Sequence, residues 1–238
     1  MILFFDLNIS EKTEQFIFNR DESKHLVKVL RKKIDETITV TNGRGLEWKG
    51  VLIEVNVQKS IANCTAVIIH KPQKNKIHLA IAPTKNNNRM EWLIEKVTEL
   101  GISSITPLLC DHSERRVIKK ERFEKIAIAA MKQSLQFFIP QINDLTNFNA
   151  FIKVTKNSSF IAHCKNKSKE LLSKSDLDSN NVTLLIGPEG DFSLREIELA
   201  INNKIKPISL GNQRFRTETA GLLACHTVFV KQLQKSNL

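Results

Sequence analysis

The sequence predicts an α/β protein made of a small β-rich domain over residues 1–72 and a parallel-sheet domain over residues 73–238. Three observations support this prediction. The first 72 residues are mostly strand-like runs rich in β-branched and aromatic residues. The polar segment 71–76 contains a proline and has the composition of a linker. After it, short apolar strands alternate with amphipathic helices, which is the pattern of a parallel sheet covered by helices.

In the first domain we expect four strands and one helix. The dipeptide Asn42-Gly43 is a strong hairpin signal because both residues tolerate the positive φ angles of a tight turn. A helix is expected around Ser23–Lys33, with Leu26, Val29 and Leu30 along one side. A small β-barrel carrying a basic helix fits this pattern. The expected strands are Phe16–Phe18, Thr37–Val40, Val51–Val57 and Ala66–Ile69.

In the second domain strands and helices alternate. The expected strands are Ile77–Ala82, Ile102–Leu109, Ser159–Ala162, Val182–Ile186 and Ile205–Leu210. The expected helices are Met90–Leu100, ended by Gly101, then Glu121–Phe137, Leu194–Ile201 and Glu218–Gln232. Ser193 and Glu196 have the spacing of a capping box at the start of the third of these helices.

Composition narrows the class of protein. The apolar fraction of 41% and the charged fraction of 26% are those of an ordinary globular protein. No apolar run reaches the length of a membrane span, and Asp6 interrupts the N-terminal apolar run before it could serve as a signal peptide. We therefore expect a cytoplasmic protein with no membrane partner. Cys64, Cys110, Cys164 and Cys225 lack a metal-type spacing, so we expect buried, unreactive thiols and no metal.

Charge points to a polyanionic partner. The chain has 36 Lys and Arg residues against 25 acidic ones, a formal net charge of +11. Basic residues concentrate in the segment Arg20–Lys33 and again in Arg115–Lys125. Each segment taken alone is equally well explained as a solvated helix face.

Two glycine-bearing loops are the most informative feature for function. A buried strand ends in Gly187-Pro188-Glu189-Gly190, and a second one ends in Leu210-Gly211 shortly before Arg216-Thr217. Loops at the ends of neighbouring parallel strands surround small ligands, and glycine lets the main chain approach them. Neither a P-loop nor a dinucleotide fingerprint is present, and Glu189 would repel an anion. The loops therefore fit a ligand without phosphates, although Gly-Pro-Glu-Gly by itself is only a tight turn.

The second loop carries two arginines, Arg214 and Arg216, before the last expected helix. An arginine at the mouth of such a site can orient a phosphate or stabilise developing negative charge. The alternative is a surface ion pair with Glu218 or Glu189, and local sequence does not decide between the two. We expect Thr217 to cap the last helix.

Taken together, the motifs resemble the RsmE family of ribosomal RNA methyltransferases over nearly the whole chain. The matching motifs are His25-Leu26 with Val29-Leu30-Arg31, Arg89–Lys96 with Glu99-Leu100-Gly101, Gln133-Ser134 with Pro140, Ile186–Gly190, and Leu210-Gly211 with Arg216–Ala220. The resemblance implies a PUA-like barrel followed by a SPOUT-type domain with a trefoil knot at the cofactor site, assembled as a homodimer. It also implies methyl transfer from S-adenosylmethionine to N3 of one uridine in 16S rRNA of the small ribosomal subunit.

Roles are expected for particular residues of this chain. Arg216 and Glu189 are the expected catalytic residues, with Glu218 as the other acidic candidate for the base. His163 either lines the cofactor pocket or is a buried histidine with satisfied hydrogen bonds. The basic helix is the expected RNA contact, through His25, Lys28, Arg31 and Lys32. The expected cofactor contacts are Ile186, Gly187, Pro188, Glu189, Gly190, Leu210, Gly211, Phe215, Arg216 and Thr217.

The chain departs from the family pattern at two places. Asp191 stands where the family often has a second glycine, and Arg214 is displaced by one position. One competing interpretation is a SPOUT enzyme that acts on another RNA, such as a tRNA ribose methyltransferase. Another is a non-catalytic RNA-binding protein. A small-molecule enzyme would leave the charge excess unexplained.

Overall fold

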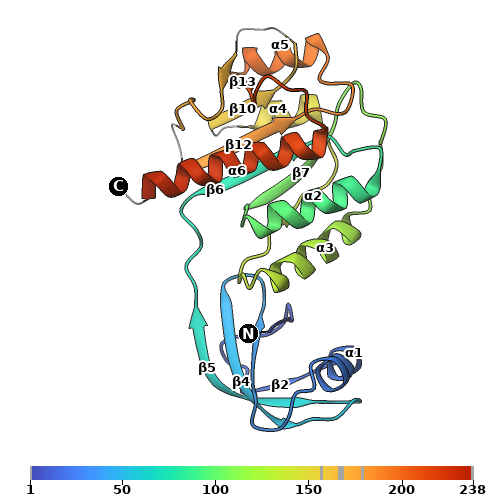
Figure 1. Ribbon diagram of the computed structural model, residues 1–238, viewed down its shortest axis with the longest axis vertical. Coiled ribbons are helices and arrows are strands. Elements are labelled where there is room, and N and C mark those ends of the chain that lie inside the picture. Colours follow the sequence, from blue (N-terminus) through green and yellow to red (C-terminus); the bar gives the residue numbers. More distant parts are fainter. Residues whose placement is uncertain (1, 156–157, 166–168, 178–179, 237–238) are drawn as a thin grey trace. The chain divides into compact units, whose positions relative to one another are not determined.

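The computed structural model describes residues 2–155, 158–165, 169–177 and 180–236, and the chain forms two compact units (Figure 1). Unit 1 comprises Met1–Pro72 with Ile128–Ile139, and unit 2 comprises Gln73–Ala127 with Pro140–Leu238. The segment Ile128–Ile139 lies within the 73–238 range expected for the second domain. It joins unit 1 through backbone hydrogen bonds with the loop that contains the two glycines of the hairpin. The Gly45 amide donates to the Phe137 carbonyl at 2.8 Å, and the Ile139 amide donates to the Gly43 carbonyl at 2.9 Å.

Unit 1 is a curled five-stranded sheet in the order β1-β3-β4-β5-β2. Its strands are β1 (Leu3–Phe5), β2 (Gln15–Ile17), β3 (Thr37–Thr41), β4 (Leu46–Glu54) and β5 (Ile61–Ile69). The hairpin predicted at Asn42-Gly43 is confirmed, because β3 and β4 pair antiparallel on either side of it. Trp48, Phe4, Phe18 and Leu26 are among the buried side chains that form the core. The sequence did not predict β1, which pairs in parallel with β3.

The basic helix differs from its predicted form. It begins earlier, as α1 (Arg20–Lys24), because the Asn19 side chain accepts a hydrogen bond from the Glu22 amide and caps it. It continues as a π-helical turn, η1 (His25–Val29), closed by a hydrogen bond from the Leu30 amide to the His25 carbonyl. The predicted extension to Lys33 is wrong, since Arg31 has a φ of 53°. Val29 is exposed rather than packed inward.

Unit 2 contains an eight-stranded sheet in the order β11-β13-β10-β12-β6-β7-β8, with β9 beside β7, and all these strand pairs are parallel. The strands are β6 (Lys76–Ile81), β7 (Ser104–Leu109), β8 (Gln141–Ile142), β9 (Thr146–Asn147), β10 (Ser158–Ala162), β11 (Glu170–Leu171), β12 (Asn181–Ile186) and β13 (Lys206–Ser209). The helices are α2 (Asn87–Glu99), α3 (Lys120–Gln133), α4 (Phe148–Val154), α5 (Leu194–Asn202) and α6 (Thr217–Ser236), with the end of α3 belonging to unit 1.

Helices cover both faces of this sheet, as the strands' continuous apolar runs require. On one face α6 packs on β6 and α2, and a Cβ atom at Gly221 would lie 2.9 Å from Ile81 and 3.3 Å from Leu93. On the other face Ala80, Leu185 and neighbouring strand residues pack with α4 and α5. Figure 1 shows α2 and α6 side by side in front of the sheet. The predicted parallel α/β architecture is confirmed.

The predicted helices need correction at their ends, and one helix was not predicted. The helix α2 begins at Asn87 rather than Met90, and α5 extends by one residue to Asn202. The helix predicted over Glu121–Phe137 ends at Gln133, because Leu135 has a φ of 55°. The last helix begins at Thr217 and extends beyond Gln232. The short helix α4 lacks a long periodic run, and for that reason the sequence did not reveal it.

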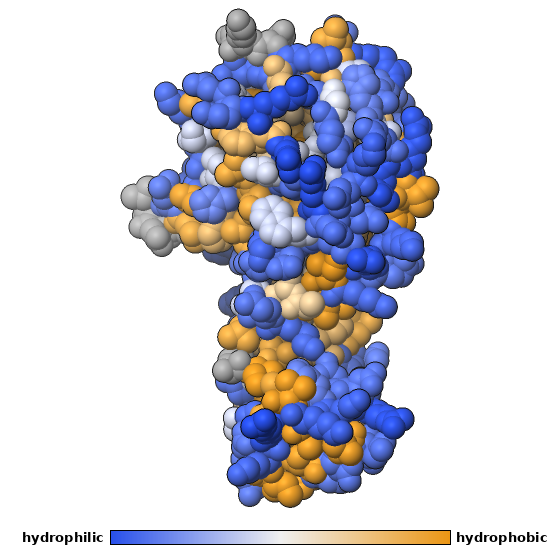
Figure 2. All heavy atoms as spheres, turned by 45° about the vertical axis from the view of Figure 1, so that its right-hand side comes forward, coloured by the Kyte–Doolittle hydropathy of each residue, from blue (hydrophilic) through white to orange (hydrophobic). Residues whose placement is uncertain are grey.

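No helix in the described part of the chain is long and apolar enough to span a lipid bilayer. On the face shown in Figure 2, hydrophobic residues reach the surface in separate groups among hydrophilic ones.

All four cysteines are free thiols. Cys110 and Cys225 are buried, which raises the pKa of each thiol. The expectation of four buried thiols is wrong for Cys164, which is exposed, and for Cys64, which is only partly buried.

A histidine in the sheet of unit 2 makes stability depend on pH. His78 on β6 lies 2.7 Å from the Thr106 hydroxyl and packs against Phe151. Burial lowers its pKa from 6.5 to about 4. An unfolded chain binds a proton at this residue below pH 6.5, whereas the folded chain does not until about pH 4, so falling pH favours unfolding.

We therefore expect the His78→Gln variant to lose less stability than the wild type between pH 6.5 and pH 4. The difference should approach about 2–3 kcal/mol, measured by urea unfolding at a series of pH values. His226→Gln, at an exposed position on α6, is the control and should follow the wild-type curve. Parallel curves for wild type and His78→Gln would contradict the assignment.

Candidate functional site

A cavity of about 910 Å³ lies in unit 2 where three parallel strands end. Its walls come from the residues that follow β10, β12 and β13. Because β10 pairs with both β12 and β13, the carboxyl ends of the three strands meet at one edge of the sheet. Nine of the ten expected cofactor contacts line this cavity, namely Ile186, Gly187, Pro188, Glu189, Leu210, Gly211, Phe215, Arg216 and Thr217. Gly190, the tenth, does not.

Packing inside the protein explains the two glycines of the first loop. A Cβ atom at Gly187 would lie 3.1 Å from the ring and the amide of Phe192. A Cβ atom at Gly190 would lie 3.1 Å from the Cβ of His112. Protein packing thus restricts a side chain at both positions, besides the close approach to a ligand inferred from the sequence. Gly211 differs, since its φ is 146° and the nearest atom to a Cβ there lies 3.5 Å away.

Residues from two other strand ends hold the first loop in place. The Glu189 carboxylate accepts a hydrogen bond from the Lys85 amide at 2.9 Å. The Nδ1 atom of His112 lies 2.9 Å from the Asp191 carbonyl and 3.2 Å from the Gly190 carbonyl. Both carbonyls are acceptors, so Nδ1 must carry the proton. The loop after β12 is therefore fastened to the loops after β6 and β7.

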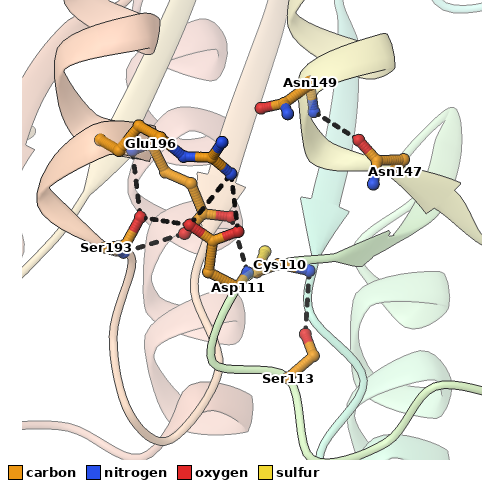
Figure 3. A network of polar contacts seen from close by, with 8 residues as sticks. Cys110, Asp111, Ser113, Asn147, Asn149, Ser193 and Glu196 are labelled. Carbon is orange, nitrogen blue, oxygen red and sulfur yellow. Dashed lines mark hydrogen bonds and ion pairs between the residues drawn. The ribbon is translucent and has the colours of Figure 1, made fainter.

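A second network fixes the start of α5, as Figure 3 shows. Ser193 and Glu196 form the predicted capping box. The Glu196 carboxylate, which is 1% exposed, also accepts a hydrogen bond from the Asp111 amide at 2.9 Å. Hydrogen bonds from the Ser193 hydroxyl and from Arg195 keep the pKa of Asp111 below its ordinary value. The end of β7 and the first turn of α5 are thus joined beside the cavity loop.

The second loop corrects the predicted role of Thr217. Its hydroxyl donates to the Gly187 carbonyl at 3.1 Å rather than capping α6, whose first residue it is. This bond joins the two loops directly. The preceding residue, Arg216, provides the carbonyl that accepts from the Ala220 amide.

The arginines of this loop differ in their contacts. Arg214 donates to the Glu189 carbonyl at 3.4 Å. Arg216 is exposed and makes no ion pair or side-chain hydrogen bond with the described residues. The ion pair between Arg216 and Glu218 or Glu189 considered from the sequence is absent from the described part of the chain. Instead the buried Glu218 carboxylate lies 3.6 Å from Arg89 on α2.

The histidine that follows β10 also faces the cavity. His163, at the end of β10, lines it and is 8% exposed. Burial and the nearby Lys169 ammonium lower its pKa, so the imidazole is neutral at physiological pH. Its Nε2 atom has no hydrogen-bond partner among the described residues.

The two basic segments are used differently. In the second segment, Arg115 donates to the carbonyls of Thr84 and Lys85, and Arg122 pairs with Glu91. These two arginines therefore make contacts that stabilise unit 2. In unit 1, three of the four expected RNA contacts are exposed, namely His25, Lys28 and Arg31. The fourth, Lys32, is half-buried and lies 2.5 Å from the Glu36 carboxylate.

Sequence analysis missed Lys85, Asp111 and His112, which support the cavity loops without belonging to a motif. Each follows a strand of the parallel sheet, β6 or β7. Position at a strand end is the signal that would have singled them out. In the described part of the chain there is no group of three or more metal-ligand side chains.

Family comparisons agree with the two-unit architecture. The RNA methyltransferase domain family matches residues 71–229, and the RNA methyltransferase PUA domain family matches residues 18–61. Ribosomal RNA small subunit methyltransferase E of Rickettsia conorii is 30% identical over 208 residues, covering 86% of this chain and 85% of that protein. The chain belongs to the ribosomal RNA small subunit methyltransferase E family. The resemblance found in the sequence is thereby confirmed.

Solved structures support the same family. A protein from Porphyromonas gingivalis, described as a probable rRNA-methyltransferase, is 35% identical with a TM-score of 0.88 and full coverage of both chains. A protein from Legionella pneumophila, described as a methyltransferase with S-adenosylmethionine bound, is 26% identical with a TM-score of 0.86 and 97% coverage of each chain. The PUA-like and SPOUT-type parts of the predicted fold are therefore confirmed for this member of the methyltransferase E family.

The bond between the two cavity loops gives a test. Thr217→Val keeps the shape of the side chain and removes the donor, leaving the buried Gly187 carbonyl with one partner fewer. We expect a loss of about 1 kcal/mol in the free energy of unfolding, and faster amide exchange in residues 187–190. Thr219→Val, two positions along α6, is the matched control. Equal exchange rates in the two variants would show that the bond does not order the loop.

Proposed function

We propose that this protein transfers the methyl group of S-adenosylmethionine to N3 of a specific uridine in the 16S rRNA of the small ribosomal subunit. Its family supports the broader part of this function, methylation of ribosomal RNA dependent on S-adenosylmethionine. The position on the base and the roles of individual residues are what the proposal adds. The observation that carries it is the cavity at three strand ends, with the Arg216 guanidinium in its wall and without an ion pair to any described residue.

The residues present fit S-adenosylmethionine. The cavity volume of about 910 Å³ lies within the range of small-molecule sites. Ile186, Leu210 and Phe215 offer apolar surface for an adenine ring, and the glycine loops offer backbone amides and carbonyls. Two carboxylates, Glu189 and Asp191, suit a ligand with a cationic centre. When bound, this cofactor supplies an electrophilic methyl group on a positively charged sulfur.

Arg216 is the residue that stabilises the uridine. Removal of the N3 proton spreads negative charge over the neighbouring carbonyl oxygens of the base. An unpaired guanidinium can donate to these oxygens without first breaking an ion pair. Arg216 also precedes the first turn of α6, whose free backbone amides favour negative charge nearby. Both effects act on the anion that has to form.

Glu189 is the proposed proton acceptor. Of the two glutamates considered for this role, Glu189 and Glu218, Glu189 lines the cavity and Glu218 does not. The Lys85 amide binds one of its oxygens, and this bond orients the carboxylate. Glu218 is 6% exposed and faces Arg89. The N3 atom belongs to the pairing edge of the base, so the uridine must be unpaired or turned out of its stack to reach these groups.

The assembly and location follow the same family expectation. The proposal includes a homodimer, a trefoil knot at the cofactor loops and a cytoplasmic site of action. Support for a homodimer comes from α6, where Leu222, Leu223, Phe229 and Val230 are only partly buried and Leu233 is 49% exposed. On α2, which packs against α6, Trp92 is 42% exposed. Apolar side chains on adjacent helices suit a self-complementary interface.

Replacing the proposed catalytic arginine separates binding from chemistry. We expect Arg216→Ala to lower kcat by about a hundredfold or more, the usual effect of losing a charge-stabilising donor. Cofactor affinity and the unfolding curve should stay close to wild type. Arg216→Lys should recover only part of the rate, because lysine lacks the planar fork. Arg116→Ala, which removes an exposed arginine of the segment after β7, is the control. Normal turnover in Arg216→Ala would exclude this residue from the mechanism.

The basic helix should determine how RNA binding depends on salt. Lys28 and Arg31 are exposed and free to reach phosphates, and each such contact contributes about one to the slope of log K against log salt. We expect Lys28→Ala with Arg31→Ala to reduce that slope by about two, measured with a 16S rRNA fragment. Lys32→Ala should change it less, since Glu36 already holds this ammonium. Lys12→Ala, also exposed in unit 1, is the control.

The modified nucleoside itself tests the whole assignment. Mass mapping of 16S rRNA from cells lacking this protein should show one uridine without its N3 methyl group. Adding back the purified protein with S-adenosylmethionine should restore it. A missing methyl group on a tRNA ribose instead would favour the competing SPOUT activity.

A further inference from the structure

Asp191 places a carboxylate in the cavity wall at the position where the family often has glycine. Its φ is 65°, in the left-handed region, which glycine adopts freely and which aspartate tolerates better than most residues. The backbone at this position therefore does not need a side chain. One carboxylate oxygen accepts from the Phe192 amide and the other from the Cys164 amide, both at 2.8 Å.

These two bonds hold the carboxylate between β10 and β12. Cys164 follows β10 and Phe192 belongs to the loop after β12. Each oxygen retains a lone pair, since a carboxylate accepts about four hydrogen bonds. The described residues form no ion pair with Asp191: His112 contacts its backbone carbonyl, and Lys169 and His163 interact with its charge only at longer range. The negative charge is thus fixed in direction and not neutralised by direct contact.

The other charged groups in the wall are distributed unevenly. Glu189 lies on the same loop as Asp191, so this side of the cavity carries two negative charges. Arg214 and Arg216 lie on the loop after β13, and Arg214 reaches the Glu189 carbonyl. Lys169 faces the cavity beside β11 and donates to the His163 carbonyl and to the Lys165 carbonyl. A bound molecule therefore meets two carboxylates on the β12 loop, two arginines on the β13 loop, and the Lys169 ammonium, which interacts with the Asp191 charge.

Resting on the proposed function, we propose that Asp191 makes this cavity discriminate by charge between the methyl donor and its product. The donor carries a positive sulfur. Transfer of the methyl carbon to the deprotonated N3 of the uridine would form the carbon–nitrogen bond and break the carbon–sulfur bond, whose electron pair would stay on sulfur and leave a neutral thioether. A fixed carboxylate in the same cavity favours the cationic donor over the neutral product. Asp191 thus promotes product release after each turnover, in addition to tying two strand ends together.

Ligand binding by calorimetry tests this proposal without measuring activity. The ligands are S-adenosylmethionine, the neutral product S-adenosylhomocysteine, and sinefungin, which carries a cationic amine in place of the sulfonium. We expect Asp191→Asn and Asp191→Gly to lower the ratio of product Kd to donor Kd by about tenfold. That factor corresponds to two charges about 8 Å apart at an effective dielectric of about 30. Sinefungin should weaken together with the donor.

Asp191→Gly is the variant that keeps the backbone unstrained, since glycine suits a φ of 65°. Asp144→Asn removes an equal charge from unit 2 at a side chain that is 86% exposed, and should leave the ratio unchanged. Equal weakening of donor and product in both Asp191 variants would reduce this residue to a structural tie and overturn the proposal. A wild-type protein that binds neither molecule would refute the proposed cofactor site, and the inference with it.

Discussion

Parallel pairing of β10 with both β12 and β13 is the constraint on which the site depends. These strands are separated by tens of residues in the sequence, yet the pairing brings their carboxyl ends to one edge of the sheet. The walls of the cavity come from these ends, from the neighbouring helix α6 and from the segment around β11. The buried apolar runs that drive the pairing are therefore also what positions the polar loops.

Residues that do not line the cavity help to hold the cavity loops in place. Lys85 and His112 hold the first loop through backbone groups, and Asp111 with Glu196 fixes the helix that follows. None of these four residues lines the cavity. A buried carboxylate such as Glu196 would be costly without partners, and here two backbone amides compensate it. Such support leaves the cavity wall free for residues that bind or react.

The proposed catalytic arginine, Arg216, differs from Arg115 and Arg122 in its contacts. Arg115 and Arg122 spend their charge on carbonyls and on Glu91, whereas Arg216 has no partner among the described residues. An arginine already engaged in folding cannot respond to charge that develops on a substrate without losing those contacts. Sequence shows how many arginines a segment contains, but not which of them are engaged.

The sequence by itself determined the alternation of strands and helices, the capping box of α5, the hairpin at Asn42-Gly43 and the family. These features are local, because periodicity, caps and turns depend on residues only a few positions apart. Tertiary structure alone decided that Thr217 joins Gly187 instead of capping α6, that the basic helix ends in a π-turn, and that His112 and Lys85 support the loops. Each of those contacts joins residues far apart in the chain or depends on the packing around it, and no local pattern encodes them.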